Sequence, residues 1–415
     1  MKGEKTILLL PAYFTPEQMA STHLDNDRYL AFAQEGFKML LCTPSPTRGI
    51  DSNSRKLYKK RKKEVMYDGM MNVVRFSLFD ENNNTLLRAF RYVISFIQQL
   101  CYGIVNSKNV DVVFLVSTPP IQGLIGAFLK KFKKVPFIYN LQDIFPDSLV
   151  STGLAKKGGM LWKIGRYVER LTYKYADKII VVSDDFKENL ILKGVPENKI
   201  RVIYNWVDEN EIVPISKQNN TLYDEFKIRR DYFNIVYAGN FGNAQDIDTL
   251  ISAASELQSI ENITFCFWGS GGLVEKYKSE VLKKQLSNVR FFPLQPKNRV
   301  SEVYSLGDAC IVSCKKGIGK NAFPSKTWSI MSTGTPIIAN YDKATCLEKI
   351  LKNSESGLLS DAGDVKQLVD NILFLYNSPD ICKRYGYNAR TFVEKNVCKK
   401  NSTKEYIDVI KSLTT

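Results

Sequence analysis

The chain has 415 residues, 44% of them hydrophobic, and carries a formal net charge of +15. This length exceeds the size at which a single hydrophobic core keeps growing, so we expect two domains. Eight cysteines without a CxxC pair and one histidine, His23, argue against a zinc site and favour reduced thiols in the cytosol.

The beginning of the chain gives no sign of a targeting segment. MKGEKTILLLP runs directly into a strand-like segment without a cleavage site, so we expect no signal peptide. The longest uncharged apolar run, 112–129, contains Pro119-Pro120 and fits strand, turn and helix better than a membrane span.

The first half of the chain alternates short apolar runs with helical patterns. The expected strands are TILLLP, FKMLLCT, MNVVRFSL, DVVFLV, VPFIYN, KIIVVS and KIRVIYN, and the expected helices include 23–35 and 160–175. Such alternation predicts a parallel sheet covered by helices on both faces. Because ligands of such sheets bind beyond the carboxyl ends of the strands, the loops 11–22, 117–122 and 142–148 are candidate sites.

The positive charge is concentrated in this half. Residues 1–205 contain 31 Lys+Arg and 19 Asp+Glu, a net of +12, whereas the remainder has a net of +3. The run RKLYKKRKK at 55–63 is either a solvated loop or a segment attracted to anionic lipid. An amphipathic helix expected at 86–105 packs into a core or lies on a membrane surface. We therefore expect anionic partners other than small ligands to meet the first half.

The alternation stops near residues 205–208. The stretch 209–231 is polar and has the composition of a linker between domains. We therefore expect one domain at 1–207 and a second that begins at residue 208.

A second series of strands and helices follows. The strands FNIVYAG and ITFCFWG are each followed by a glycine loop and a helix, at 246–257 and 273–284, and NVRFFPL ends the third strand at Leu294. Loops with glycines that open helices at one edge of a sheet indicate phosphate binding. The loop residues in question are Gly239, Asn240, Gly242 and Asn243 after the first strand and Gly269, Ser270 and Gly271 after the second.

Residues 308–340 add a strand, a basic loop, a short helix and another strand. Ser325 is the expected N-cap and Gly334 the expected C′ residue of the helix, while Trp328 and Met331 share a buried face. Lys326 lies in the first turn, where the helix dipole disfavours a cation.

The lysines at this helix start suggest an anion site. Lys315, Lys316 and Lys320 accompany Lys326 there, and exposed amides together with lysines typically bind phosphate. The alternative is that these lysines point into solvent.

Common nucleotide and metal motifs are missing. No GxxxxGK[ST] occurs, and no GxGxxG precedes an acidic residue at the spacing of a dinucleotide fingerprint. Asp246 and Asp248 have the spacing of a metal-binding DxD. However, a carboxylate is favoured at a helix start in any case, so we expect Asp246 to cap a helix.

Together these motifs resemble a GT-B glycosyltransferase of family 4 over nearly the whole chain. The resemblance rests on two strand–helix domains joined near NWVD, the YAGN and GSG loops, and the PSK…GxP segment. The segments YNLQDIFPDSL and PSKTWSIMSTGTPIIAN further resemble enzymes that transfer N-acetylfucosamine or related sugars in O-antigen and capsule synthesis.

The resemblance implies an α/β fold of two Rossmann-like, doubly wound domains that face a cleft. The first domain, 1–207, would bind the acceptor, and the second, 208–395, the nucleotide sugar. Residues 396–415 would form a helix that crosses back onto the first domain. Such enzymes retain the anomeric configuration and need no metal and no cofactor other than the UDP-sugar as co-substrate.

The family's functional positions are only partly matched. Its two glutamates correspond to Asn321 and Ser329, and the cations that follow the first glycine loop are missing. The resemblance therefore implies that Lys326, the nearby lysines and the backbone of Gly242 and Asn243 meet the diphosphate. Asp143 stands where the family keeps a catalytic residue, with helix capping before Phe145-Pro146 as the alternative, and Gln142 replaces a histidine found in many relatives.

The candidate residues follow from motifs and resemblance together. The candidate catalytic residues are Asp143 and Lys326, and the candidate donor-binding residues are Gly239, Asn240, Gly242, Asn243, Gly269, Ser270, Gly271, Leu294, Lys320, Asn321, Pro324, Ser325 and Ser329.

We interpret the chain as a metal-independent enzyme that moves a deoxyhexosamine from a UDP-sugar to a polyprenyl-diphosphate-linked saccharide. It would work in the cytoplasm at the inner face of the plasma membrane, without a nucleic acid partner. Two alternatives remain: a sugar-nucleotide 2-epimerase, whose acid–base histidine has only His23 as a candidate, and a basic nucleic-acid-binding protein. Against the latter, the basic run has no interleaved aromatic residue except Tyr58.

Overall fold

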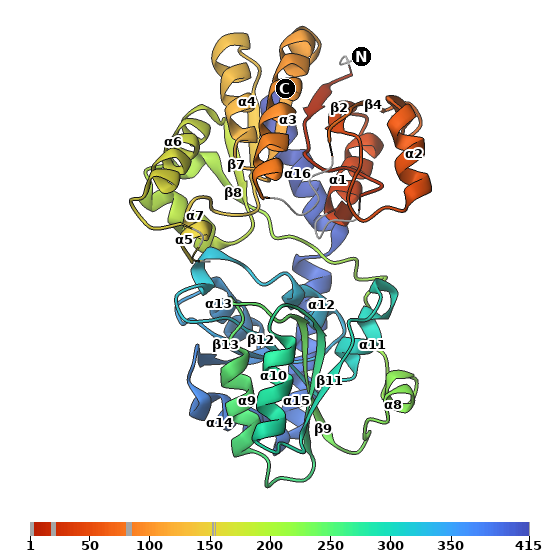
Figure 1. Cartoon of the computed structure of the whole chain (residues 1–415), viewed down its shortest axis with the longest axis vertical. Coiled ribbons are helices and arrows are strands. Elements are labelled where there is room, and N and C mark those ends of the chain that lie inside the picture. Colours follow the sequence, from red (N-terminus) through yellow and green to blue (C-terminus); the bar gives the residue numbers. More distant parts are fainter. Residues whose placement is uncertain (1–3, 18–21, 80–84, 152, 154, 415) are drawn as a thin grey trace. The chain divides into compact units, whose positions relative to one another are not determined.

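The computed structural model describes residues 4–17, 22–79, 85–151, 153 and 155–414. The chain forms two compact units, one of residues 1–204 with 402–415 and one of residues 205–401. These boundaries lie a few residues from the ends of the expected domains at 207 and 395. Each unit is built on its own β-sheet with helices on both sides (Figure 1).

Unit 1 contains an eight-stranded sheet in the order β3-β4-β2-β1-β5-β6-β7-β8. All neighbouring strands are parallel except β3, which pairs antiparallel with β4 at the edge. The seven strands expected from the sequence are confirmed, and β3 is an addition. The strands are β1 (Thr6–Leu9), β2 (Lys38–Pro44), β3 (Lys63–Met66), β4 (Met71–Phe76), β5 (Val112–Val116), β6 (Phe137–Leu141), β7 (Lys178–Val181) and β8 (Ile200–Val202).

The helices of unit 1 cover both faces of this sheet because successive residues of a buried strand point to opposite sides. Val113 and Leu115 of β5 belong to the core on one face, to which α3 also contributes. On the other face, the ring centroid of Phe114 lies 5.9 Å from that of Phe32 in α1 and 6.0 Å from that of Tyr406 in α16. The helices are α1 (Thr22–Gln34), α2 (Ser52–Lys60), α3 (Thr85–Asn106), α4 (Gln122–Phe128), α5 (Asp147–Ser151), α6 (Met160–Tyr175), α7 (Asp184–Leu192) and α16 (Lys399–Thr414), with short helical turns at Ser107–Asn109, Leu129–Lys133 and Glu197–Lys199.

The basic run 55–63 is not a loop. Most of it forms α2, whose N-cap Asp51 accepts hydrogen bonds from the backbone of Asn53 and Ser54, and its last residue begins β3. Strong helix formers such as Lys and Arg make this short helix possible once its first turn is capped. No side chain of α2 is buried, so the run remains solvent-facing as a helix.

The amphipathic helix α3 combines both expected roles. Phe96 and Leu100 pack against the core of unit 1, whereas Phe90, Val93 and Ile97 are 65%, 47% and 52% exposed. Within the described part of the chain, no helix has the length and apolar character needed to cross a bilayer.

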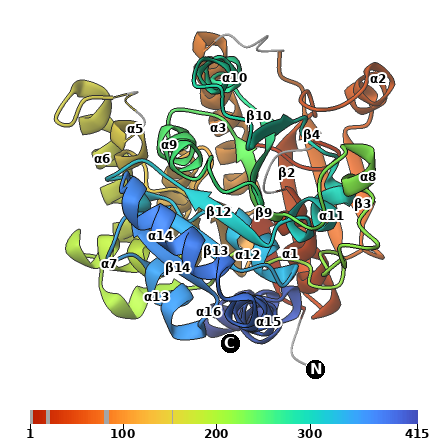
Figure 2. The same cartoon turned by 90° about the horizontal axis from the view of Figure 1, so that it is seen from below.

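Unit 2 contains a fully parallel sheet in the order β11-β10-β9-β12-β13-β14. Figure 2 shows α9, α10 and α14 on one side of this sheet and α11, α12 and α15 on the other. The strands are β9 (Phe233–Asn240), β10 (Ile263–Ser270), β11 (Val289–Phe292), β12 (Ala309–Ser313), β13 (Ile337–Tyr341) and β14 (Gly357–Asp361). The helices are α8 (Leu222–Glu225), α9 (Ile247–Glu256), α10 (Val274–Lys283), α11 (Val300–Ser305), α12 (Lys326–Ser332), α13 (Cys346–Ser354), α14 (Val365–Tyr376) and α15 (Pro379–Asn396), with turns at Lys297–Arg299 and Gly319–Asn321.

The polar stretch 209–231 is an integral part of unit 2, so its interpretation as a linker is wrong. Leu222 and Tyr223 are buried, and the Tyr223 hydroxyl donates to the carbonyl of Leu306 at 2.7 Å. Asn220 donates to the carbonyl of Glu302 at 2.7 Å. A few buried anchors in a polar segment are enough to fix it, and composition alone does not reveal them.

Candidate functional site

The strand order of unit 2 creates a natural ligand position. β9 and β12 are neighbours in the sheet but are followed by helices on opposite sides, α9 and α12 (Figure 2). In open α/β sheets such a reversal leaves a crevice beyond the carboxyl ends of the two strands. A cavity of about 360 Å³ lies there, and its lining includes the predicted residues Gly239, Asn240, Pro324, Ser325 and Lys326.

Lys326 supplies the charge of this cavity. Its Nζ lies 4.0 Å from the ring centroid of Tyr237 and 3.3 Å from the carbonyl oxygen of Ala238, to which it donates a hydrogen bond. The residue as a whole is only half-buried, but its ammonium end is desolvated, and this lowers its pKa to about 8. No carboxylate of the described residues contributes to that pKa. A desolvated cation without an acidic partner is unfavourable alone and is stabilised by an anionic ligand.

The start of α12 differs from the expected anion-binding helix terminus. Ser325 occupies the N-cap position, as expected, but its side chain makes no capping hydrogen bond. The helix is seven residues long, and its dipole is correspondingly small. Gly334 follows with a φ of 67°, as expected of a C′ residue, and Trp328 and Met331 are both buried. Any attraction for an anion at this helix start therefore comes from the charge of Lys326 rather than from the helix terminus.

Two glycine amides of the basic loop before α12 already have a partner. The backbone N–H groups of Gly317 and Gly319 donate to the carboxylate of Asp342 at 2.9 and 2.8 Å, so this loop already binds an anion from its own chain. Lys315 and Lys320 are exposed, and Lys320 is not among the residues that line the cavity. For these lysines the structure favours the alternative, in which they point into solvent.

The glycines after β10 serve the packing of one loop on another. A Cβ at Gly269 would lie 1.9 Å from the carbonyl oxygen of Gly239, and one at Gly271 would lie 2.5 Å from that of Phe241. Their φ values of 143° and 151° are also unfavourable for other residues. These glycines therefore allow the β10 loop to approach the β9 loop. Neither Gly269 nor Gly271 lines the cavity.

Other predicted donor-binding residues lie outside the cavity lining. Ser270 and Asn243 are exposed, and Leu294 is 65% exposed on the loop after β11. Gly242 donates its backbone N–H to the side-chain oxygen of Gln245 at 3.3 Å.

The two positions that correspond to the family's glutamates are also removed from the cavity. Asn321 ends the turn Gly319–Asn321 and Ser329 lies in the middle of α12, and both are half-buried. Neither lines the cavity, and their roles toward a donor remain predictions.

Asp246 and Asp248 do not converge. Asp246 immediately precedes α9, and its carboxylate accepts from the Thr249 hydroxyl at 2.7 Å and from the Asn340 amide at 3.1 Å rather than from a backbone N–H. Asp248 pairs with Lys276 at 3.1 Å. The expected backbone cap is therefore wrong in detail, because the carboxylate instead bridges α9 to β13. Among the described residues, no three His, Cys, Asp or Glu side chains are placed to hold a metal ion.

Asp143 lies in unit 1, in the loop after β6. Desolvation raises its pKa, and hydrogen bonds from the Ser148 side chain and the Ile144 backbone partly offset this effect. Phe145 also donates its backbone N–H to the carbonyl of Asp143 at 3.1 Å. Asp143 thus organises the loop that leads to α5. A catalytic role remains a prediction.

Sequence reasoning missed several polar residues of the cavity, among them the two tyrosines Tyr237 and Tyr341 and the amide of Gln245. Tyr237 donates to the carbonyl of Asn240 at 2.7 Å, and Tyr341 donates to the carbonyl of Gly319 at 3.0 Å. Both tyrosines lie near the carboxyl ends of their strands, β9 and β13, where the rule for parallel sheets could have found them.

Comparison with known proteins identifies the kind of enzyme. Residues 30–211 match the family model described as Glycosyltransferase Family 4, and residues 219–392 match that of Glycosyl transferases group 1. A probable glycosyltransferase, WbjE of Pseudomonas aeruginosa, is 25% identical over 64% of this chain and 67% of its own length. The putative colanic acid biosynthesis glycosyl transferase WcaI of Escherichia coli K12 is 24% identical over 68% and 69%.

Among solved structures, Anabaena HepE in complex with UDP superposes with a TM-score of 0.72 and 15% identity. The match covers 98% of this chain and 100% of that one. The family models and the curated relatives show that the chain is a glycosyltransferase, the first of the three activities considered from the sequence. The chain is a GT-B glycosyltransferase of family 4.

Proposed function

We propose that this enzyme transfers an N-acetylated deoxyhexosamine from a UDP-sugar to a polyprenyl-diphosphate-linked saccharide, with retention of configuration, in surface polysaccharide synthesis. The observation that carries the proposal is the desolvated ammonium of Lys326, which faces the cavity at the switch point of unit 2 without a carboxylate partner. The colanic acid role named for WcaI supports surface polysaccharide synthesis, and the UDP bound by HepE supports a UDP-sugar as the donor.

The UDP diphosphate would form an ion pair with the ammonium of Lys326. A hydrogen bond between ionised groups is about twice as strong as one between neutral groups, and it is strengthened further in a desolvated cavity. The backbone of Gly239 and Asn240 lines the same space and would lie beside the phosphates. Lys326 thus stabilises the charge that grows on the leaving diphosphate in the transition state.

The transfer needs no nucleophile from the protein. The bond between the anomeric carbon and the diphosphate oxygen breaks, and the acceptor hydroxyl oxygen forms a new bond to the same carbon on the same face. The proton of that hydroxyl passes to an oxygen of the leaving UDP, so charge and atoms balance. Asp143, with its raised pKa, would position the acceptor in unit 1.

A lipid-linked acceptor requires contact with the membrane surface. The exposed cations of α2 and the exposed apolar face of α3 offer that contact in unit 1. On this basis the enzyme should sediment with anionic vesicles at low salt and leave them at high salt, because screening weakens such attraction. Sedimentation that is indifferent to salt would contradict the electrostatic part.

We also propose that turnover needs no divalent metal. Asp246 is engaged by Thr249 and Asn340, and Asp248 by Lys276, so neither carboxylate is presented as a ligand. Activity should therefore survive EDTA. Loss of activity with chelator and its return with Mn²⁺ would require Asp246 and Asp248 to be reinterpreted as metal ligands.

The decisive experiment is mass spectrometry of products formed from a lipid-linked acceptor and a panel of UDP-sugars. A mass increment of one N-acetyl-deoxyhexosamine, with turnover lowered about 100-fold in Asp143→Asn but UDP affinity preserved, is the expected result. Transfer from another nucleotide sugar class, or no transfer to lipid-linked saccharide, would contradict the proposal.

A further inference from the structure

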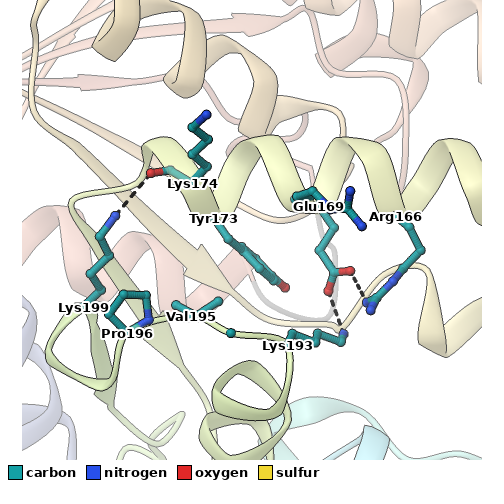
Figure 3. Close-up of a pocket in the computed structure, with 10 residues that line it drawn as sticks. Arg166, Glu169, Tyr173, Lys174, Lys193, Val195, Pro196 and Lys199 are labelled. Atoms are coloured by element: carbon teal, nitrogen blue, oxygen red, sulfur yellow. Dashed lines mark hydrogen bonds and ion pairs between the residues drawn. The ribbon is translucent and has the colours of Figure 1, made fainter.

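Unit 1 contains a second cavity, of about 380 Å³, that none of the expected sites includes. It lies between α6 and the segment that connects α7 to β8, and Figure 3 shows the side chains that surround it. Its volume is comparable to that of the Lys326 cavity in unit 2, but its chemistry differs.

The lining of this second cavity is strongly basic. Arg166, Arg170 and Lys174 recur every fourth residue along one face of α6, and Lys193 and Lys199 face them from the connecting segment. Glu169 is the only carboxylate among the lining residues. The cavity therefore carries an excess of positive charge.

Part of that charge is already neutralised. Glu169 pairs with Lys193 at 2.7 Å and also with Arg166 (Figure 3). Lys193 pairs in addition with Asp147 at 2.7 Å. Lys199 donates to the carbonyl oxygen of Lys174 (Figure 3) and to that of Ala176, at the end of α6.

The cations at the rim are different. In the described part of the chain no ion pair is found for Arg170 or Lys174, and both side chains are exposed. The rim of the cavity is thus free to attract an anion.

A polar group inside the cavity also lacks a hydrogen-bond partner among the described residues. The Tyr173 side chain, 6% exposed, has a hydroxyl that faces Glu169 without completing a hydrogen bond (Figure 3). Burial and the charge of Glu169 raise the pKa of this hydroxyl, so it keeps its proton. A buried hydroxyl without an acceptor costs free energy unless a ligand supplies one.

An exposed apolar stripe runs along the neighbouring face of α6. Met160, Leu161, Ile164 and Tyr167 are 81%, 51%, 53% and 63% exposed. At 3.6 residues per turn, the exposed cations Lys163, Arg170 and Lys174 fall between this stripe and the cavity face. Apolar residues flanked by cations characterise helices that lie in the plane of a membrane surface.

α6 and α3 share one layer of unit 1. Both contribute to the core on the same face of its sheet, and Figure 2 shows them on the side opposite to α1 and α16. The exposed apolar faces of both helices therefore belong to one side of unit 1, which suits a single bilayer contact.

We propose that the second cavity binds the phosphate headgroup of an anionic lipid while the stripe of α6 lies in the interface of the bilayer. The phosphate would accept from Arg170 and Lys174 at the rim and from Tyr173 inside, since phosphate oxygens are strong acceptors for arginine and hydroxyl donors. This site adds to the contacts proposed for α2 and α3 and does not depend on them.

The test is sedimentation of the full chain with vesicles of phosphatidylcholine alone or mixed with phosphatidylglycerol. The double variant Arg170→Ala/Lys174→Ala should bind mixed vesicles about 10- to 30-fold more weakly, as expected for two surface cations. The matched control Lys108→Ala/Lys133→Ala removes two exposed cations of unit 1 that do not line the cavity, and should change binding less than about 3-fold.

Two further variants separate the cavity from general electrostatics. Tyr173→Phe leaves the charge unchanged and should weaken binding to mixed vesicles about 3-fold. Ile164→Ser should weaken binding to both kinds of vesicle. All variants should keep the wild-type affinity for UDP, which verifies the fold.

Equal effects of the two double variants together with no effect of Tyr173→Phe would overturn the proposal. Calorimetry with inorganic pyrophosphate tests whether the cavity binds a soluble phosphate ligand instead of a lipid headgroup. Tight binding of pyrophosphate that is lost in Arg170→Ala/Lys174→Ala, without any binding to vesicles, would assign the cavity to a soluble phosphate ligand and overturn the lipid assignment.

Discussion

Two cationic regions of unit 2 lie next to each other in the sequence but differ in physical state. The lysines of the loop 315–320 are exposed, and its Gly317 and Gly319 amides are satisfied by Asp342. Lys326, a few residues on, has a desolvated ammonium, a lowered pKa and no carboxylate partner among the described residues. The number of cations in a segment is therefore a weaker sign of a ligand than the solvation and pairing of one of them.

The solvation of each region determines how much its lysines gain from binding an anion. Water solvates an exposed lysine about as well as a ligand does, so such a residue gains little from binding. A desolvated ammonium has lost its water already, and an anionic ligand restores the lost stabilisation. Four experiments test this difference between the two regions.

The largest effect is expected for Lys326→Met, which removes the charge and keeps the volume. UDP affinity should fall by about 1.5–3 kcal/mol, roughly 10- to 150-fold, because a hydrogen bond to a charged group is lost. Isothermal titration calorimetry measures this change. The unliganded variant should melt at the same temperature as the wild type or higher, since an unpaired desolvated charge has been removed. An unchanged UDP affinity would place the diphosphate elsewhere.

The pH dependence of UDP binding should reflect deprotonation of the Lys326 ammonium. The pKa of Lys326 is lowered to about 8, so the ammonium is present below that pH and lost above it. Affinity should therefore decline about tenfold per pH unit above pH 8, until the higher pKa of the complex is reached. In Lys326→Met this dependence should vanish, and its persistence there would contradict the assignment.

The contribution of Lys326 to the free energy of unfolding changes with pH in the opposite direction to its contribution to UDP affinity. Below pH 8 Lys326 is protonated in both the folded and the unfolded state, and desolvation of its charge costs stability. As pH rises from about 8 toward the ordinary pKa of lysine, the folded state binds fewer protons than the unfolded state. The contribution of Lys326 to the free energy of unfolding therefore improves over that window.

Asp342→Ala should produce an intermediate effect. It removes the carboxylate that accepts from Gly317 and Gly319, and the loop should lose about 1.5–3 kcal/mol of local stability. Hydrogen exchange at these two amides should accelerate about 10- to 100-fold. UDP affinity should decline by less than about tenfold, because Ile318 of the loop lines the cavity without carrying charge. Unchanged amide protection would mean that Asp342 does not hold the loop.

The smallest effect is expected for Lys315→Ala and Lys320→Ala. Both side chains are exposed, so each substitution should change UDP affinity by less than about 0.5 kcal/mol. These variants are the matched controls for Lys326→Met. A loss in either that equals the loss in Lys326→Met would abolish the distinction between the two regions.

The sequence predicted most of the fold because its apolar periodicity agrees with the local structure. Residues 160–175 were expected as a helix and form α6 with the same bounds, and seven strands of unit 1 were found in order. The edge strand β3 was missed because it begins in a run of lysines and arginines, which an exposed edge tolerates but strand composition does not indicate. Residues 209–231 were misread because their few buried side chains act through contacts with distant residues.

Only part of the candidate site could be predicted, because local sequence patterns do not reveal contacts between distant residues. The loop after β9 and the residues around Lys326 could be located, since the carboxyl ends of parallel strands meet at one edge. The capture of the Gly317 and Gly319 amides by Asp342 could not, because it depends on the fold of a loop that returns to the end of β13. The glycines of the β10 loop were identified correctly as special positions; their contacts with Gly239 and Phe241 show a role in packing, and contact with phosphate stays a prediction.

The most direct test of the central claim is an NMR titration of the Lys326 side chain with and without UDP, with Lys326→Met used to assign its signal. We predict a pKa of about 8 in the free enzyme and a clear rise when UDP is bound, because the diphosphate stabilises the ammonium. An ordinary lysine pKa in the free enzyme, or a pKa that UDP leaves unchanged, would contradict the account.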